Sequence, residues 1–270
     1  PAASVVGALH YTPCNNAIVA DMGGTTTGIA IIANGRAVLS QDATQVGPWQ
    51  PMVESVRVLS IGLGGDSEVG FSGGAGLAIG PRRVVPMSLL IDRHPQLMSA
   101  LISQSKTTPN ARSNRFAVPL FATQAQYDNL AAAEKQAWET LSEGPIDLSL
   151  QAMSNRPLTR SIAELVRGGL ALYSGYTPSD AAHVLGLMNH WSTEAAQLAT
   201  TIWHRQMRQV YGWGRRSSEN PCEIARVVHE KVITTIVQAI MRASLECDHP
   251  NSSKSELAAL NQLVIEWIHP

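Results

Sequence analysis

The sequence predicts an α/β protein in two parts, a strand-rich part over residues 1–90 and a mainly helical part over residues 91–270. Glycine pairs, turn signals and short apolar runs are concentrated in the first part. Beyond Val84 glycine becomes rarer, and apolar residues recur at the spacing of amphipathic helices. At 270 residues the chain is long enough to bury a sizeable core.

The first part is predicted to open with a helix start at residues 1–9, with Pro1 near the first turn, and to continue as strands. Asn34-Gly35 is a strong two-residue hairpin signal, so the strands on either side of it should pair antiparallel. Apolar runs predict a first strand that leads into Asp21. They predict further strands at residues 28–32, 36–39, 56–61, 69–71 and 77–79.

The stretch D-M-G-G-T-T-T, which joins the first two strands, carries the clearest candidate site. Paired glycines let the backbone approach a ligand and turn its N–H groups towards anionic oxygens. Threonine hydroxyls can donate further hydrogen bonds, and a carboxylate at a strand end can hold a hydrated divalent cation or orient a water. A plain Gly-Gly hairpin with β-branched threonines is the alternative. The candidates are Asp21 for the metal and for catalysis, and Gly23, Gly24, Thr25, Thr26 and Thr27 for phosphate.

A second glycine-rich turn follows residues 56–61 and carries the carboxylates Asp66 and Glu68. Glycine again permits close backbone approach, and an acid or hydroxyl here could touch a ligand, a metal or a developing charge. The alternative is a flexible connection in which Asp66 caps the next element. Arg82 and Arg83 could pair with a phosphate or a carboxylate. The candidates in this turn are Asp66 as a catalytic acid and Gly64, Gly65 and Ser67 as residues that line the ligand.

The second part is predicted to consist of amphipathic helices. Thr177 is a typical N-cap, because Pro178 follows in the first turn and Asp180 completes an acidic capping box. A metal pair formed by Asp180 and His183, one helical turn apart, is the functional alternative. The predicted helices cover residues 86–103, 124–141, 158–173, 192–211, a long helix that starts at Asn220-Pro221, and residues 255–268.

Composition argues against several classes of partner. The formal net charge is −1 and no run is rich in lysine or arginine, so neither nucleic acid nor an anionic membrane is expected. No apolar run approaches the ~20 residues of a membrane span. Three scattered cysteines, Cys14, Cys222 and Cys247, fit plain thiols in a reducing cytoplasm. The chain begins with Pro1 and lacks a signal-peptide pattern, so we expect a piece of a longer protein.

Four blocks carry a resemblance to a known family: P-A-A-S-V-V-G-A at residues 1–8, D-M-G-G-T-T-T-G-I-A-I-I at 21–32, I-G-L-G-G-D-S-E-V at 61–69 with I-G-P-R-R-V-V-P at 79–86, and Y-T-P-S-D-A-A-H-V-L-G-L at 176–187. Together they resemble the central segment of the A-type, N-methylhydantoinase A-like subunit of the hydantoinase/oxoprolinase family. The blocks occur in the family's order and cover nearly the whole chain. D-x-G-G-T alone would also fit sugar kinases, acetate kinases and dehydratase activators.

The resemblance implies a ribonuclease-H-like (actin-like ATPase) half-domain over residues 1–90. It also implies ATP-dependent opening of cyclic amides such as hydantoins or 5-oxoproline through a phosphorylated intermediate; some relatives instead carboxylate ketones. The cofactors would be ATP and Mg²⁺, and the partner a B-type subunit. By position, Asp21 would hold Mg²⁺ or its water, residues 23–27 would bind the β- and γ-phosphates, and residues 64–67 would line the same cleft.

Two features depart from the family. Its motif often places an acid directly after the threonines, where this chain has Gly28. If that acid positions the metal or the loop, its absence puts nucleotide turnover in doubt. An actin-like ATPase also closes two half-domains around ATP, and the family's first D-x-G-G-T loop and its adenosine-side glycine motif fall outside residues 1–270. We therefore expect this chain to hold half of the nucleotide cleft and to be inactive alone.

Three other functions are compatible with the same motifs. A small-molecule kinase would release a phosphorylated product without opening a ring. A non-catalytic, nucleotide-gated module would drive a partner subunit by opening and closing. A degenerate paralogue would be kept for assembly. The sequence leaves open the ring substrate, the identity of the metal and whether the chain forms a homo-oligomer.

Overall fold

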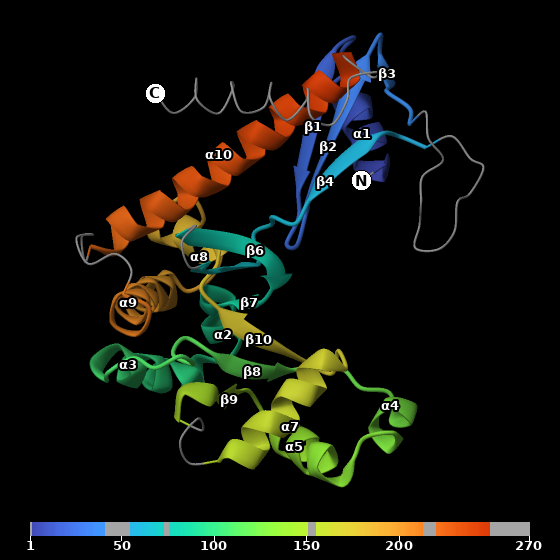
Figure 1. Ribbon diagram of the computed structural model, residues 1–270. Helices are drawn as coiled ribbons and strands as arrows, with labels where there is room; N and C mark the ends of the chain where they lie inside the picture. The colour runs from blue at the N-terminus through green and yellow to red at the C-terminus, as the bar shows by residue number, and fades with distance from the viewer. Residues whose placement is uncertain (1, 41–54, 73–75, 151–154, 213–219, 249–270) are drawn as a thin grey trace. The chain divides into compact units, whose positions relative to one another are not determined.

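The computed structural model describes residues 2–40, 55–72, 76–150, 155–212 and 220–248. Its contacts divide the chain into two compact units: unit 1 comprises Pro1–Gly64 and Lys231–Pro270, and unit 2 comprises Gly65–Glu230. Helices and strands occur in both units, so the chain is a mixed α/β protein (Figure 1). The helix predicted over residues 255–268 lies outside the described residues.

The helices and strands are described below by the labels of Figure 1. The helices are α1 (Ala2–Tyr11), α2 (Met87–Arg93), the 3₁₀ helix η2 (Pro95–Leu97), α3 (Met98–Lys106), α4 (Gln124–Asp128), α5 (Ala132–Ser142), α7 (Arg156–Arg167), α8 (Pro178–Val184), α9 (Thr193–Val210) and α10 (Pro221–Asp248). The strands are β1 (Ala17–Met22), β2 (Thr27–Ala33), β3 (Arg36–Ala37), β4 (Val58–Ile61), β5 (Ser67–Phe71), β6 (Leu77–Arg83), β7 (Val85–Pro86), β8 (Phe116–Pro119), β9 (Ile146–Asp147) and β10 (Ala171–Gly175).

The sheet of unit 1 is organised around β2. β1 pairs antiparallel with β2 along its length, while β3 and β4 pair antiparallel with opposite ends of β2. Asn34 and Gly35 have φ angles of 53° and 73°, the left-handed conformation that a two-residue hairpin requires. The predicted hairpin is thus confirmed. The strand predicted over residues 56–61 is also present as β4, and it is mostly half-buried.

Helices cover both faces of this sheet, because alternate residues of β2 point to opposite sides. Ile32 packs against Val5 of α1 on one face. Ile29 packs against Ala239 and Ala243 of α10 on the other face. Unit 1 therefore has three layers, α1, the sheet and the C-terminal part of α10.

The largest core of unit 2 forms where the β5–β6 hairpin packs against α2, α3, α8 and α9. Val69 of β5 and Trp203 of α9 are buried in it, and the indole Nε1 of Trp203 donates a hydrogen bond to the Val69 carbonyl at 2.8 Å. Ile224 and Val228, from the first turns of α10, complete the same core. The strands predicted over residues 69–71 and 77–79 are present as the β5–β6 hairpin, which belongs to unit 2.

A second sheet of unit 2 has the strand order β7-β10-β8-β9. β10 runs parallel to β7 and antiparallel to β8, and β8 runs antiparallel to β9. α5 and α7 pack on it through Leu141, Ile162 and Leu165. The part of the chain predicted to be mainly helical therefore also contains strands.

Several predicted helices are shorter than expected, for local reasons. The helix predicted over residues 86–103 is divided into α2, η2 and α3 at Pro95, whose nitrogen carries no hydrogen to continue the helical ladder. The helix predicted over 158–173 ends at Gly168, since Gly169 takes a φ of 72°, and the chain continues as β10. The helix predicted over 124–141 is divided into α4 and α5.

The division into units differs from the boundary expected at residue 90. The β5–β6 hairpin packs with the helices of unit 2, and the chain from Lys231 packs with the sheet of unit 1.

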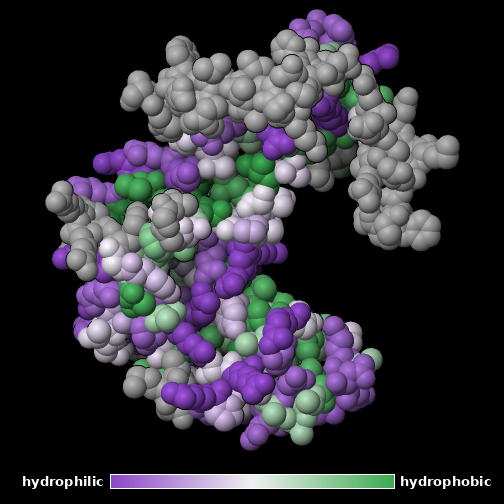
Figure 2. Space-filling view, in the orientation of Figure 1, coloured by the Kyte–Doolittle hydropathy of each residue, from purple (hydrophilic) through white to green (hydrophobic). Residues whose placement is uncertain are grey.

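Hydrophilic and hydrophobic residues are interspersed over the face in Figure 2. Among the described residues, no helix combines the length and the apolarity that a membrane span needs.

Candidate functional site

The glycine-threonine stretch forms a short loop between β1 and β2, as the sequence predicts. The Gly23 amide donates to the Thr26 carbonyl at 2.9 Å and closes the loop. The Gly24 and Thr25 amides make no hydrogen bond within the described part of the chain. Asp21 is exposed near the end of β1. The loop thus brings backbone amides and hydroxyls, groups that can donate hydrogen bonds to an anion, close to one exposed carboxylate.

The three threonines do not have the same role. Thr27 is fully buried, and its hydroxyl donates to the Leu63 carbonyl at 2.7 Å. Thr25 is half-buried and Thr26 is exposed. Thr27 therefore ties the second glycine-rich turn to the first loop, which leaves Thr25 and Thr26 as the hydroxyls that can reach a ligand. The sequence analysis missed Leu63, because a backbone carbonyl acceptor leaves no signature in the residue type.

Gly64 fits against the first loop only because it has no side chain. A Cβ built on Gly64 would lie 2.5 Å from the Gly24 carbonyl carbon, the Gly24 carbonyl oxygen and the Thr25 nitrogen. A Cβ atom essentially never approaches another non-bonded heavy atom this closely, so any larger residue would push the loop out of place. The structure therefore brings together Gly24, Thr25, Thr27 and Gly64 from the two predicted motifs.

Gly28, which stands where the resemblance led us to expect an acid, lies on β2 next to β1. Asp21 and Gly28 are directly opposed in the β1–β2 ladder. Directly opposed residues of an antiparallel pair share one face of the sheet, with Cβ atoms about 5 Å apart. An acid at position 28 would stand beside Asp21 and could complete a two-carboxylate cation site. Because position 28 is a glycine, Asp21 supplies the one carboxylate of this cross-strand pair.

The remaining residues of the second turn belong to unit 2. The Gly65 carbonyl accepts hydrogen bonds from the Ser179 amide at 3.0 Å and the Ser179 hydroxyl at 2.9 Å. Asp66 accepts from Nε and Nη2 of Arg83 at 3.2 and 3.1 Å. Ser67 is fully buried in β5. Gly65 and Asp66 thus anchor the start of unit 2, and a fully buried Ser67 cannot touch a ligand in this conformation.

The alternative metal pair at Asp180 and His183 is wrong. Asp180 completes the predicted capping box of α8, since it accepts from the Thr177 amide at 3.0 Å and the Thr177 hydroxyl at 2.9 Å. It also accepts from the Met87 amide and from the amide and hydroxyl of Ser88, so it caps the start of α2 as well. Burial raises the pKa of the Asp180 carboxyl, and the hydrogen bonds from Ser88, Thr177 and Met87 oppose that shift.

Both ring nitrogens of His183 also have hydrogen-bond partners within the protein. Its Nδ1 lies 2.7 Å from the Ser179 carbonyl, and its Nε2 accepts from the Trp191 amide at 3.2 Å. These partners fit one neutral tautomer and leave neither nitrogen for a metal. Within the described ranges, no group of three histidine, cysteine or acidic side chains is placed to hold a metal ion.

Comparison with known proteins places the chain in a family. A model of the hydantoinase/oxoprolinase family matches residues 1–253. The chain belongs to the hydantoinase/oxoprolinase family. It is also similar to a chain of the nucleotide-free structure of acetone carboxylase, from work on the mechanism of ATP-dependent acetone carboxylation, with a TM-score of 0.41 and 14% identity. That match covers 90% of this chain and 23% of the other, so this chain spans about a quarter of that protein chain. No curated protein matches the sequence.

Proposed function

We propose that the chain is the phosphate-binding part of an ATP-dependent hydrolase that opens cyclic amides of the hydantoin or 5-oxoproline type. Unit 1 would be its ribonuclease-H-like half-domain. Membership of the hydantoinase/oxoprolinase family supports the reaction class. The observation that carries the proposal is the packing of Gly64 on the backbone of Gly24 and Thr25, because it holds an amide-rich loop in a fixed shape.

Each residue of the loop has a proposed role. The amides of Gly24 and Thr25 and the hydroxyls of Thr25 and Thr26 would bind the β- and γ-phosphates. Asp21 would hold Mg²⁺ or its water, since Mg²⁺ is commonly bound by one or two carboxylates together with substrate phosphates. Gly23, Thr27 and Gly64 would keep the loop in shape. We keep Asp66 as a candidate catalytic acid, positioned by Arg83, with Gly65 and Ser67 supporting its turn.

The proposed chemistry explains why a ring amide would need ATP. A ring amide is a poor electrophile, because its nitrogen donates electrons to the carbonyl. Transfer of the γ-phosphoryl group to the amide oxygen, with departure of ADP, turns that oxygen into a leaving group. Water then adds to the ring carbon, and the ring C–N bond breaks with protonation of the nitrogen to leave an acyl phosphate. A second water hydrolyses the acyl phosphate to the free acid and phosphate. The products are a ring-opened acid, ADP and phosphate.

The second candidate is a non-catalytic module whose nucleotide binding acts on a partner subunit. Gly28 opposite Asp21 favours it, because one carboxylate positions a metal less firmly than two. A small-molecule kinase is the third candidate, and it predicts a phosphorylated organic product. The partner we propose is a B-type subunit.

The test is turnover by the full-length protein with its B-type subunit, in the presence of ATP and either hydantoin or 5-oxoproline. Phosphate release and the organic product are measured together. The proposal predicts substrate-stimulated ATP hydrolysis and a ring-opened acid. A phosphorylated product with the ring intact would establish the kinase, and nucleotide-dependent partner binding without turnover would establish the gated module.

A further inference from the structure

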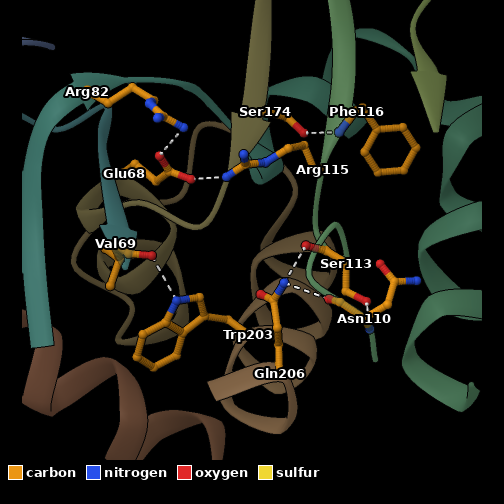
Figure 3. A network of polar contacts seen from close by, with 10 residues as sticks. All are labelled: Glu68, Val69, Arg82, Asn110, Ser113, Arg115, Phe116, Ser174, Trp203 and Gln206. Carbon is orange, nitrogen blue, oxygen red and sulfur yellow. Dashed lines mark hydrogen bonds and ion pairs between the residues drawn. The ribbon is translucent and has the colours of Figure 1, made fainter. Parts of the chain in front are cut away.

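A small cavity of about 140 Å³ lies within unit 2, and its lining includes no residue assigned above to phosphate binding. Its walls come from β5, α9, the end of β10 and the segment before β8. Figure 3 shows the polar contacts of its lining residues. Glu68 and Arg115 lie together at one end of this view, and Trp203 and Gln206 lie at the other. The lining residues that the argument uses are Glu68, Gly70, Asn114, Arg115, Trp203 and Gln206.

Three charged groups form a cluster at one side of the cavity: Glu68 and Arg115, which line it, and Arg82, which pairs with Glu68 from outside the lining, so the cluster has a net charge of +1. Glu68 is paired both with Arg115 and with Arg82, whose Nη1 lies 3.2 Å from the Glu68 carboxylate. One carboxylate thus serves two guanidinium groups. Arg115 also lies over the Tyr173 ring, 5.1 Å from its centroid, which fixes the direction of the guanidinium. An entering anion would therefore meet a positioned and only partly neutralised arginine.

The opposite side of the cavity is aromatic. Trp203 is held by its hydrogen bond to the Val69 carbonyl, and Tyr176 packs against it with the ring centroids 5.4 Å apart. Burial raises the pKa of the Tyr176 phenol, so this ring stays neutral and does not repel an anion. Rigid aromatic faces of this kind favour a flat ligand body.

Neutral polar groups complete the lining. Gln206 is fixed by hydrogen bonds to the Asn110 and Ser113 carbonyls at 2.8 and 3.3 Å. Asn114 has a φ of 64° and is almost fully buried; its Nδ2 donates to the Ala199 carbonyl at 2.7 Å. The Oδ1 of Asn114 has no hydrogen-bond partner in the described part of the chain.

The volume limits the size of the occupant. One water occupies about 30 Å³ of liquid, so a cavity of about 140 Å³ has room for four or five waters, or for a molecule of roughly one small ring. We propose that unit 2 binds a small organic monoanion here, with a flat ring-sized body against Trp203 and its acidic group against Arg115. The proposal does not depend on nucleotide binding by unit 1.

The experiment measures binding of two probes of the same shape, benzoate and benzamide, to the 270-residue chain by calorimetry and saturation-transfer NMR. Benzoate is expected to bind about tenfold or more tightly than uncharged benzamide, because a charge-assisted hydrogen bond is stronger than a neutral one. Its affinity should fall as salt is added. Equal binding of the two probes, or no detectable binding of benzoate, would overturn the proposal.

Variants tie the binding to the cavity. Arg115→Met should weaken benzoate binding by about tenfold or more, and the control Arg167→Met, which removes an exposed arginine paired with Glu164 in α7, should leave it unchanged. Gly70→Val is a second variant, since a Cβ on this cavity-lining glycine meets no atom within 4 Å and the fold should tolerate it. It should also weaken benzoate. Unchanged benzoate affinity in both cavity variants would refute the assignment.

Discussion

Replacement of Gly64 by alanine tests the packing of the two glycine-rich turns. The new methyl carbon would start 2.5 Å from the backbone of Gly24 and Thr25, roughly 1 Å closer than an ordinary van der Waals contact. The obstruction is backbone and cannot rotate away, so the first loop has to move. Overpacking of this kind costs about 1–3 kcal/mol, and we expect Gly64→Ala to lower the free energy of unfolding by that amount.

Gly7 provides the matched control within unit 1. It lies in α1, and a Cβ built on it meets no atom within 4 Å. Alanine is favoured over glycine inside a helix by about 0.5–1 kcal/mol, so Gly7→Ala should raise stability. The same chemical change is thus predicted to have opposite signs at the two positions.

The assay combines urea unfolding followed by circular dichroism with hydrogen exchange followed by mass spectrometry. Urea unfolding measures the change in the free energy of unfolding. Hydrogen exchange locates it, and amides of β1 and β2 should exchange faster in Gly64→Ala while those of the β5–β6 hairpin are unchanged. A Gly64→Ala variant as stable as the wild type, with unchanged exchange in β1 and β2, would refute the packing argument.

Three further predictions address the loop and the interior. Thr27→Val removes the hydroxyl and leaves the Leu63 carbonyl unpaired, so urea unfolding should show a loss of about 1–3 kcal/mol. Gly28→Asp places a second carboxylate opposite Asp21 and should raise Mn²⁺ affinity about tenfold, measured by electron paramagnetic resonance. Burial raises the pKa of Tyr176 above 10.0, so the folded chain keeps a phenol proton that the unfolded chain loses. The free energy of unfolding should therefore fall as pH rises above about 10, and Tyr176→Phe should reduce that slope.

The sequence predicts best where structure is decided locally. Asn34-Gly35 specifies a hairpin turn through its own left-handed backbone, and Thr177 with Asp180 specifies a capping box within four residues. The loop at Gly23 and Gly24 is local in the same sense.

What depends on distant partners could not be predicted. The capping box of Asp180 was predicted, but its second role as a cap of α2 depends on the Ser88 amide and hydroxyl, which are far away in sequence. Gly64 gave no indication of which backbone it would meet. The sequence around Ala243 does not indicate that the C-terminal part of α10 packs against Ile29 in the sheet of unit 1. Such pairings are settled by the packing of whole elements.

The role of Asp21 is the central claim, and one measurement tests it most directly. Mg²⁺-dependent ATP hydrolysis is measured for the protein together with the proposed B-type subunit, in wild type, Asp21→Asn and the control Asp92→Asn, which alters an exposed acid of α2. We predict a loss of about a hundredfold or more for Asp21→Asn with its fold intact by circular dichroism, and no change for Asp92→Asn. Hydrolysis at the wild-type rate by Asp21→Asn would contradict the account.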